Sequence, residues 1–368
     1  MTGRKLGGPI PFIKRNRGGL NMARFATAAI YGSAALVLAT FAGWSSAAHS
    51  QTTLTMSSWV PPSHLLTKDV LSVWAQNVEK ATEGRVKFQM LAKHPSAAPG
   101  TFDAVRDGLV DVSYVTASYT PARHIFPLLP ELPGGGATAE INSVAFSRIH
   151  WKYFQPVNEY KGVKLLGVFT HGPGQMFNTK RPITKVEDLA GMKIRSGGGI
   201  SEQMARALGA SAFVKPAPES YELLSSGVAD GTFFPLESII SFKLDSVVKY
   251  ATLFPGGFYG SAFGFFMNED KWNKLSKADQ DAIMSVSGEA LARLAGKAWD
   301  ATDRAALEVM KKANIQIEEA SPELIKGVQE RSKDIIEKWK KDATAKGVDG
   351  AKVFAEFHEE LKRVAASN

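Results

Sequence analysis

The residue types that serve in catalysis occur in this 368-residue chain, but not in the spacings that common catalytic sites require. A serine nucleophile would be marked by G-x-S-x-G, a phosphate loop by G-x-x-x-x-G-K, a dinucleotide site by G-x-G-x-x-G and a zinc hydrolase by H-E-x-x-H. None of these patterns is present. The glycine runs 134–136 and 197–199 lack the spacing that should follow in a dinucleotide site, so we interpret them as flexible turns. The sequence therefore predicts no enzyme and no cofactor, although missing motifs do not exclude an enzyme.

The histidines and the absent cysteines give no sign of a metal centre. His358 precedes two glutamates on a polar C-terminal segment, but no second histidine stands near it. The chain contains no cysteine, which excludes disulfides, thiol chemistry and a lipoprotein anchor. The other histidines of the chain after residue 50 are also scattered, without the pairing typical of metal ligands: His64, His94, His124, His150 and His171.

The net charge of +8 is concentrated at the N-terminus. Residues 1–50 hold six basic residues and no acidic one, which leaves 38 basic and 36 acidic residues in the rest of the chain. A nucleic-acid-binding protein would keep its basic patch in the folded part. The charge distribution therefore argues against a nucleic-acid partner.

The first 50 residues are typical of a signal peptide. Basic residues precede the apolar run 25–44, and Ala48-His49-Ser50 has the small-x-small form of a cleavage site. We expect residues 1–50 to be removed near Ser50 and the protein to act in the periplasm. The alternative is an uncleaved membrane anchor, because the run approaches the roughly 20 apolar residues that span a bilayer. Met22 is an alternative start to Met1.

The rest of the chain alternates between strand and helix patterns. A strand at 54–58, a helix at 65–82 and a strand at 86–91 form a first β-α-β unit, which predicts parallel sheets covered by helices. A helical region follows from Ser276 to about 313, long enough to bridge two domains or to break once. Further helices are expected at 322–346 and from 351 onward.

One spacing occurs twice. Phe102 is followed by Gly108 and Asp111, and Tyr221 is followed in the same way by Gly227 and Asp230. In each case an amphipathic helix ends at glycine, and the aspartate can accept bonds from backbone N–H groups where a strand begins. The repeat favours two similarly built α/β lobes, although such turns also recur by chance in α/β proteins.

The region 167–237 carries a family resemblance. It reads Asn178-Thr-Lys-Arg-Pro-Ile183 and then Val186-Glu-Asp-Leu-Ala-Gly-Met-Lys-Ile-Arg195, followed by Gly209-Ala210, Tyr221 and Gly227-Val-Ala-Asp-Gly231. This order and spacing resemble the solute-binding proteins of the tripartite ATP-independent periplasmic (TRAP) transporters, the DctP family. The resemblance extends over most of residues 53–365.

The resemblance implies a two-lobed periplasmic-binding-protein fold of the α/β class, with a ligand cleft between the lobes and a long C-terminal helix. Lobe one would comprise 51–172 plus 260–301, and lobe two 173–259 plus 302–368. The expected function is capture of a small organic acid for the membrane permease subunits of a TRAP transporter, with the oligomeric state left open. The alternatives are a binding protein for an ATP-driven importer or a sensor kinase, and a secreted α/β hydrolase.

The resemblance also implies that Arg195 holds the ligand carboxylate. A guanidinium offers a rigid fork of donors that matches a carboxylate and stays charged at physiological pH. Gln175 stands where some family members have a second arginine, so a single cation remains. We therefore expect a monocarboxylate, with the Gln175 amide bonding to the acid or to a neighbouring oxygen.

The chain departs from the family at Thr232-Phe233-Phe234-Pro235. Other members have polar residues there, and in one branch a Glu-Trp pair helps to hold a metal ion. Phenylalanine cannot ligate a metal, so no metal site is predicted. Because neighbouring strand residues point to opposite faces, one of Phe233 and Phe234 should face the cleft, and we favour Phe234.

Further candidates for ligand contact are Trp59 and His64 after the first strand, Thr116 after a later strand, and Phe177. For each of these four a structural role is an equal alternative. One arginine among several aromatic residues indicates an acid with an apolar or aromatic body.

Overall fold

The computed structural model of the protein describes residues 51–367. The predicted signal peptide, its cleavage site and the alternative membrane anchor lie outside the described residues. Within these residues, none of the helices combines the length and apolar character that a bilayer-spanning segment needs.

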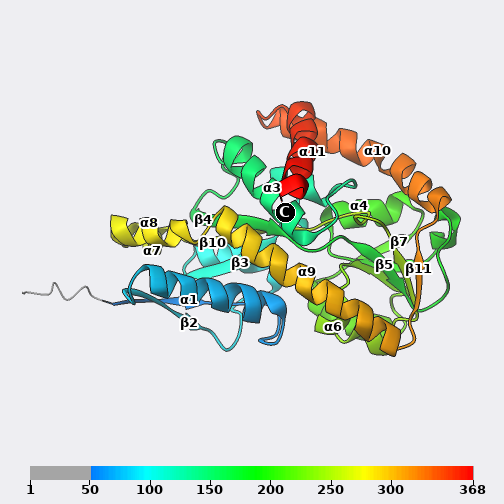
Figure 1. Ribbon diagram of the computed structural model, residues 1–368, viewed down its shortest axis with the longest axis horizontal. Helices are drawn as coiled ribbons and strands as arrows, with labels where there is room; N and C mark the ends of the chain where they lie inside the picture. The colour runs from blue at the N-terminus through cyan, green and yellow to red at the C-terminus, as the bar shows by residue number, and fades with distance from the viewer. Residues whose placement is uncertain (1–50, 368) are drawn as a thin grey trace, which may run out of the picture. The chain divides into compact units, whose positions relative to one another are not determined.

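The first of two sheets has five strands in the order β2-β1-β3-β10-β4 (Figure 1). Strand β1 runs parallel to β2 and β3, whereas β10 is antiparallel to both β3 and β4. The bounds are β1 Thr52–Met56, β2 Val86–Met90, β3 Val112–Thr116, β4 Val163–Thr170 and β10 Ala262–Asn268.

The second sheet has six strands in the order β11-β9-β5-β8-β6-β7. Strand β6 is parallel to β7 and β8, and β5 is antiparallel to β8 and β9. Strand β11, which the sequence did not indicate, pairs in parallel with β9 at the edge. The bounds are β5 Gln175–Asn178, β6 Lys193–Ser196, β7 Ser211–Val214, β8 Gly231–Phe234, β9 Tyr250–Leu253 and β11 Gln316–Glu319.

Helices cover both sheets, which confirms the predicted two-lobed α/β class. Helices α1 and α2 pack on the first sheet, and α4 packs on β6 and β7 of the second. The bounds are α1 Ser72–Ala81, α2 Thr101–Arg106, α3 Ala139–Ile149, α4 Gly199–Ala207, α5 Ser220–Ser225, α6 Ser238–Ser241, α7 Glu269–Asn273, α8 Lys277–Ser285, α9 Glu289–Lys312, α10 Pro322–Ala345 and α11 Gly350–Ser367.

The repeated spacing corresponds to the same local structure in both sheets. Gly108 after α2 has φ 77° and Gly227 after α5 has φ 75°, a left-handed conformation that favours glycine at a helix end. The Asp111 carboxylate then accepts from the Thr55 N–H at 2.8 Å, and Asp230 accepts from the Lys193 N–H at 2.9 Å. Each aspartate therefore ties the start of its strand to the neighbouring parallel strand.

The expected long helix from Ser276 breaks once. Helix α8 ends at Ser285 and α9 begins at Glu289, with Gly288 between them at φ 55°. Helix α9 packs on α3 and β4 of the first sheet and on α6 and β11 beside the second. It therefore connects the two sheets along its length (Figure 1).

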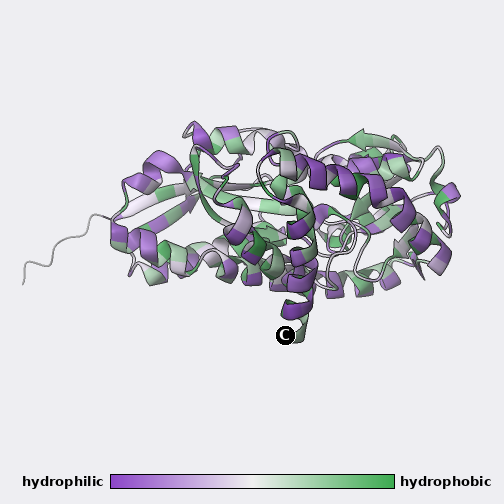
Figure 2. Ribbon diagram, turned by 90° about the horizontal axis from the view of Figure 1, so that it is seen from above, coloured by the Kyte–Doolittle hydropathy of each residue, from purple (hydrophilic) through white to green (hydrophobic). Residues whose placement is uncertain are grey.

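Hydrophilic and hydrophobic residues alternate along the helices of the protein (Figure 2). In the amphipathic helix α9, most of the buried residues are apolar. Positions Leu291, Ala295, Trp299 and Ala306 follow the spacing that places residues on one face of a helix. Helix α11 packs on both α10 and α3, and Arg148 of α3 bonds to Glu360 of α11 at 2.8 Å. The exact lobe boundaries stay a prediction, since the last helix contacts elements on both sides.

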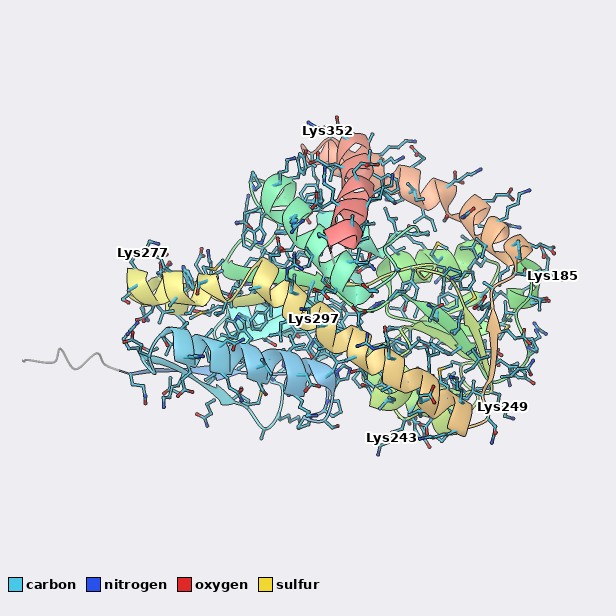
Figure 3. The ribbon with its side chains drawn as sticks, in the orientation of Figure 1. Lys185, Lys243, Lys249, Lys277, Lys297 and Lys352 are labelled. Carbon is cyan, nitrogen blue, oxygen red and sulfur yellow. The ribbon has the colours of Figure 1, made fainter. Side chains whose placement is uncertain are left out.

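The positive charge of the described residues is spread over the surface. Figure 3 labels six lysines, all exposed, that lie on separate segments of the chain: Lys185, Lys243, Lys249, Lys277, Lys297 and Lys352.

Candidate functional site

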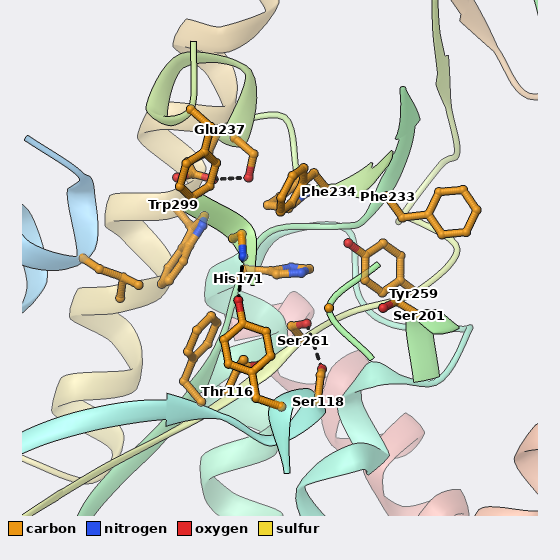
Figure 4. Close-up of a pocket in the computed structure, with 18 of the residues that line it drawn as sticks. Thr116, Ser118, His171, Ser201, Phe233, Phe234, Glu237, Tyr259, Ser261 and Trp299 are labelled. Carbon is orange, nitrogen blue, oxygen red and sulfur yellow. Dashed lines mark hydrogen bonds between the residues drawn. The ribbon is translucent and has the colours of Figure 1, made fainter. Parts of the chain in front are cut away.

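A cavity of about 60 Å³ lies where strand ends of the two sheets meet (Figure 4). The first sheet contributes Thr116 at the end of β3 and His171 just after β4. The second sheet contributes Arg195 of β6 and Phe234 of β8. Since one buried water needs roughly 10–15 Å³ on this scale, the cavity suits a compact solute.

Arg195 is a buried cation without a carboxylate partner among the described residues. It is 2% exposed, and its Nε and Nη2 donate to the Lys215 carbonyl at 2.9 and 2.7 Å. Burial lowers the pKa of the Arg195 guanidinium below its usual value, whereas Tyr119 and Tyr259 act to raise it. An arginine remains protonated in this setting, so the site holds a desolvated positive charge that an anion would neutralise.

Aromatic rings form the wall beside this cation. The guanidinium carbon lies 4.4 Å from the centre of the Phe234 ring, which itself stacks on Phe242 at 5.6 Å. Both Phe233 and Phe234 contribute to the cavity lining. Figure 4 shows the Phe233 ring turned away from the centre, and it packs edge-on against Phe258 at 4.8 Å. Of the two rings, that of Phe234 lies beside the Arg195 guanidinium.

Three other residues singled out from the sequence also line the cavity: Trp59, His64 and Thr116. Trp59 Nε1 donates to the Tyr114 carbonyl at 3.1 Å, and its ring lies 5.5 Å from that of Tyr119. Thr116 Oγ1 is buried without a hydrogen-bond partner. Thr116 is thus placed to bond to a solute, whereas Trp59 offers an apolar surface.

Gln175 and Phe177 do not reach the cavity. The Gln175 amide donates to the Phe254 carbonyl at 3.2 Å and accepts from the Phe254 N–H at 2.6 Å, so both of its polar groups hold the chain after β9. Phe177 is buried in an apolar cluster with Ala217 and Leu224. Both side chains are thus held by other parts of the protein and are not among the residues that line this cavity.

His64 and Glu237 both line the cavity and contact each other, with 3.0 Å between His64 Nε2 and Glu237 Oε1. The Leu66 N–H donates to His64 Nδ1, so the proton of a neutral ring lies on Nε2, toward the carboxylate. The pKa of Glu237 lies below its usual value, because the partners His64, Ser241 and Ser238 outweigh the opposing effect of burial. Since His64 follows β1 of the first sheet and Glu237 follows β8 of the second, this contact joins segments that extend from the two sheets.

Several lining residues were not singled out from the sequence, among them His171 and Trp299. The position of His171 at the end of a strand was a usable signal, but for Trp299 nothing in the sequence indicated a cavity. The polar residues that also line the cavity include Ser118, Tyr119 and Ser261. No group of three His, Asp or Glu side chains in residues 51–367 could hold a metal ion.

Glu131 lies behind the cavity, fully buried. Its Oε1 accepts from the Ser118 hydroxyl at 2.7 Å and from the Ala262 N–H at 3.1 Å. Its Oε2 has no hydrogen-bond partner and lies near the start of α4, where a Cβ on Gly199 would be 3.2 Å away. Burial raises the pKa of Glu131 to about 7. Because Glu131 bonds to the Ala262 N–H of β10 in the first sheet and α4 packs on the second sheet, the charge state of Glu131 affects a contact between segments attached to the two sheets.

Stability should therefore fall as the pH rises from about 4.5 to about 7, because the folded protein holds the Glu131 proton that the unfolded chain releases. Replacing Glu131 by glutamine keeps a neutral side chain and should remove about 2 kcal/mol of this fall. Urea unfolding of the wild type and of Glu131→Gln at pH 5 and pH 8 measures this change in the free energy of unfolding. Equal pH dependence in the two proteins would show that Glu131 is not the group responsible.

Comparison with known proteins identifies the family of this chain. The family model for bacterial extracellular solute-binding protein, family 7, matches residues 56–342. A protein of Comamonas testosteroni named outer membrane transporter protein TsaT is 30% identical over 299 residues, 81% of this chain and 88% of that protein.

Two solved structures are similar over most of the chain. One is a TRAP periplasmic solute-binding protein from Bordetella bronchiseptica with bound (R)-mandelate and (S)-mandelate, at TM-score 0.83 and 47% identity, covering 85% of this chain and 99% of that one. The other is a marine metagenome TRAP solute-binding protein specific for aromatic acid ligands, in complex with 3-hydroxybenzoate, at TM-score 0.80 and 29% identity, covering 86% and 99%. The chain therefore belongs to family 7 of the bacterial extracellular solute-binding proteins, and its function is to capture a small organic acid for a TRAP transporter.

Proposed function

We propose that the ligand is a monocarboxylate with a single aromatic ring, bound in the cavity and delivered to the membrane permease subunits. The observation that carries this proposal is the buried guanidinium of Arg195, which has no carboxylate partner among the described residues and stacks on Phe234. The single positive charge of Arg195 would be neutralised by one acid group on the ligand. The aromatic rings that line the cavity favour a ligand with an apolar, flat body.

Within this proposal Arg195 binds the carboxylate, and Phe234 and Trp59 contact the ring. Thr116 contributes a hydroxyl that has no partner in the protein. Gln175 and Phe177 have structural roles. The similar structures with mandelate and 3-hydroxybenzoate support an aromatic acid over a sugar acid or a dicarboxylate.

Capture would proceed by closure of the two lobes on the ligand. Strands of the first sheet present Thr116 and those of the second present Arg195, so a ligand held by both is held between the lobes. The contact between His64 and Glu237 and the contact of Glu131 with the start of α4 would form on closure. The chain would act by binding alone, in the periplasm, after removal of residues 1–50.

A ligand screen tests the proposal. The protein is purified from the periplasm of an expressing bacterium, unfolded and refolded to release bound solute, and heated with aromatic acids, straight-chain monocarboxylates, dicarboxylates and sugar acids. A ligand at about a thousand times its Kd adds about 4 kcal/mol and raises the Tm visibly. We expect aromatic monocarboxylates to give the largest shifts. A response confined to dicarboxylates or sugar acids would disprove the proposal.

A further inference from the structure

A second polar feature of the cavity is not explained by binding a carboxylate to Arg195. Trp299 of α9 lines the cavity, is 2% exposed, and its Nε1–H has no hydrogen-bond partner. An indole nitrogen can only donate, so this group needs an acceptor. Native proteins rarely leave such a buried donor unpaired, because its desolvation is then uncompensated. The missing acceptor is therefore expected on the ligand.

His171 presents the opposite requirement. Its Nδ1 lies within hydrogen-bonding distance of the Gly172 carbonyl, which can only accept, so Nδ1 carries the hydrogen. Burial lowers the pKa of His171 to about 4, so the ring is neutral at physiological pH. Its Nε2 therefore holds a lone pair. Because His171 lines the cavity, this lone pair is an acceptor available to a bound solute.

The donor and the acceptor both contact one phenylalanine. The Phe263 ring stacks on Trp299 with 5.4 Å between ring centres, and its edge-on contact with His171 is 6.5 Å. Figure 4 shows the His171 and Trp299 side chains among the residues that line the cavity. A hydroxyl group has the chemistry that both residues need, since it can accept from Trp299 Nε1–H and donate to His171 Nε2. A carboxylate satisfies only Trp299, because it has no hydrogen to offer the histidine.

We propose that Trp299 and His171 recognise a hydroxyl group on the ligand. The protein then binds aromatic hydroxy acids in preference to their deoxy counterparts and to dicarboxylates. The inference rests on the proposed function, in that Arg195 takes the carboxylate. Trp299 and His171 would then determine which aromatic acids bind well.

Two matched pairs of acids test the inference: mandelate with phenylacetate, and 3-hydroxybenzoate with benzoate. Each pair differs by one hydroxyl. Titration calorimetry on the refolded protein should show one hydroxy acid, or both, binding about 10- to 100-fold more tightly than its deoxy partner, as a buried hydrogen-bonding site implies.

Two variants test the donor and the acceptor separately. Trp299→Phe keeps a ring but loses the N–H, and His171→Asn keeps a donor near the Gly172 carbonyl but loses the Nε2 acceptor. In each, the ratio of the Kd values of the deoxy and the hydroxy acid should fall to within about 3-fold of one. Trp74→Phe is the matched control. Trp74 is equally buried and bonds through Nε1 to Ser287, but it does not line the cavity, so this variant should keep the full preference.

The outcomes separate the two proposals. Equal binding of hydroxy and deoxy acids in both pairs overturns the inference and leaves the proposed function intact. A preference that survives in both Trp299→Phe and His171→Asn also overturns it, because other groups would then read the hydroxyl. If none of the four acids binds while another class of acid does, the proposed function is wrong and the inference falls with it.

Discussion

Replacing Arg195 by methionine is expected to lower the affinity for an aromatic acid by about 30-fold or more. Truncating one partner of a buried charge pair costs about 2–5 kcal/mol, and each 1.4 kcal/mol is tenfold in Kd. Titration calorimetry against the best ligand of the screen measures the loss. The unliganded variant should be as stable as wild type or more stable, since a desolvated charge without a carboxylate partner has been removed.

Arg148→Met is the control for this experiment. Arg148 bonds to Glu289 and Glu360 far along the chain and does not line the cavity. Its replacement should lower stability and leave the ligand affinity unchanged. The opposite pattern, in which Arg195→Met unfolds the protein and Arg148→Met weakens binding, would mean that Arg195 is structural.

Replacing Gly296 by alanine is expected to destabilise the protein by about 3 kcal/mol, measured by urea unfolding. Alanine is a better helix former than glycine by about 1 kcal/mol, so propensity alone predicts the opposite sign. Packing decides the outcome. A Cβ at position 296 would lie 2.4 Å from the Glu140 Cα and 2.7 Å from the Glu140 N, which are backbone atoms of α3 and cannot move aside cheaply.

The close approach at Gly296 also positions the site. Asp300, one turn further along α9, accepts from the Ala139 and Glu140 N–H groups at 2.7 and 3.1 Å, and Trp299 lies next to it. Pushing α9 away from α3 should therefore weaken ligand binding as well. Gly327→Ala in α10 is the matched control, because its Cβ would meet only the Val186 side chain, which can shift. Similar losses for both variants would contradict the backbone-contact explanation.

Much of the fold could be predicted because it depends on local signals. The turns at Gly108 and Gly227 require a positive φ, and the aspartate three residues after each glycine has the same bond to a neighbouring strand. The start of α10 could also be predicted, because a serine followed by proline is typical of a helix start. The Ser321 side chain accepts from the Leu324 N–H, and Pro322 lies in the first turn. Strand β11 was missed because its four residues carry little pattern, and its pairing with β9 decides its conformation.

The site was predictable where sequence order fixes geometry and unpredictable where distant segments meet. Arg195 ends a recognisable strand motif, and alternation along β8 pointed to Phe234. Gln175 was expected at the ligand, but its amide is held by Phe254, 79 residues later in the chain. Trp299 lines the cavity only because α9 crosses between the sheets, which no local pattern reveals.

A crystal structure of the protein with mandelate would show whether Arg195 binds the ligand carboxylate. We predict the carboxylate on the Arg195 guanidinium, the ring against Phe234 and Trp59, and no ordered cation beside the acid. A ligand carboxylate bound to any other group, or a ligand outside the cavity lined by Arg195, would contradict it.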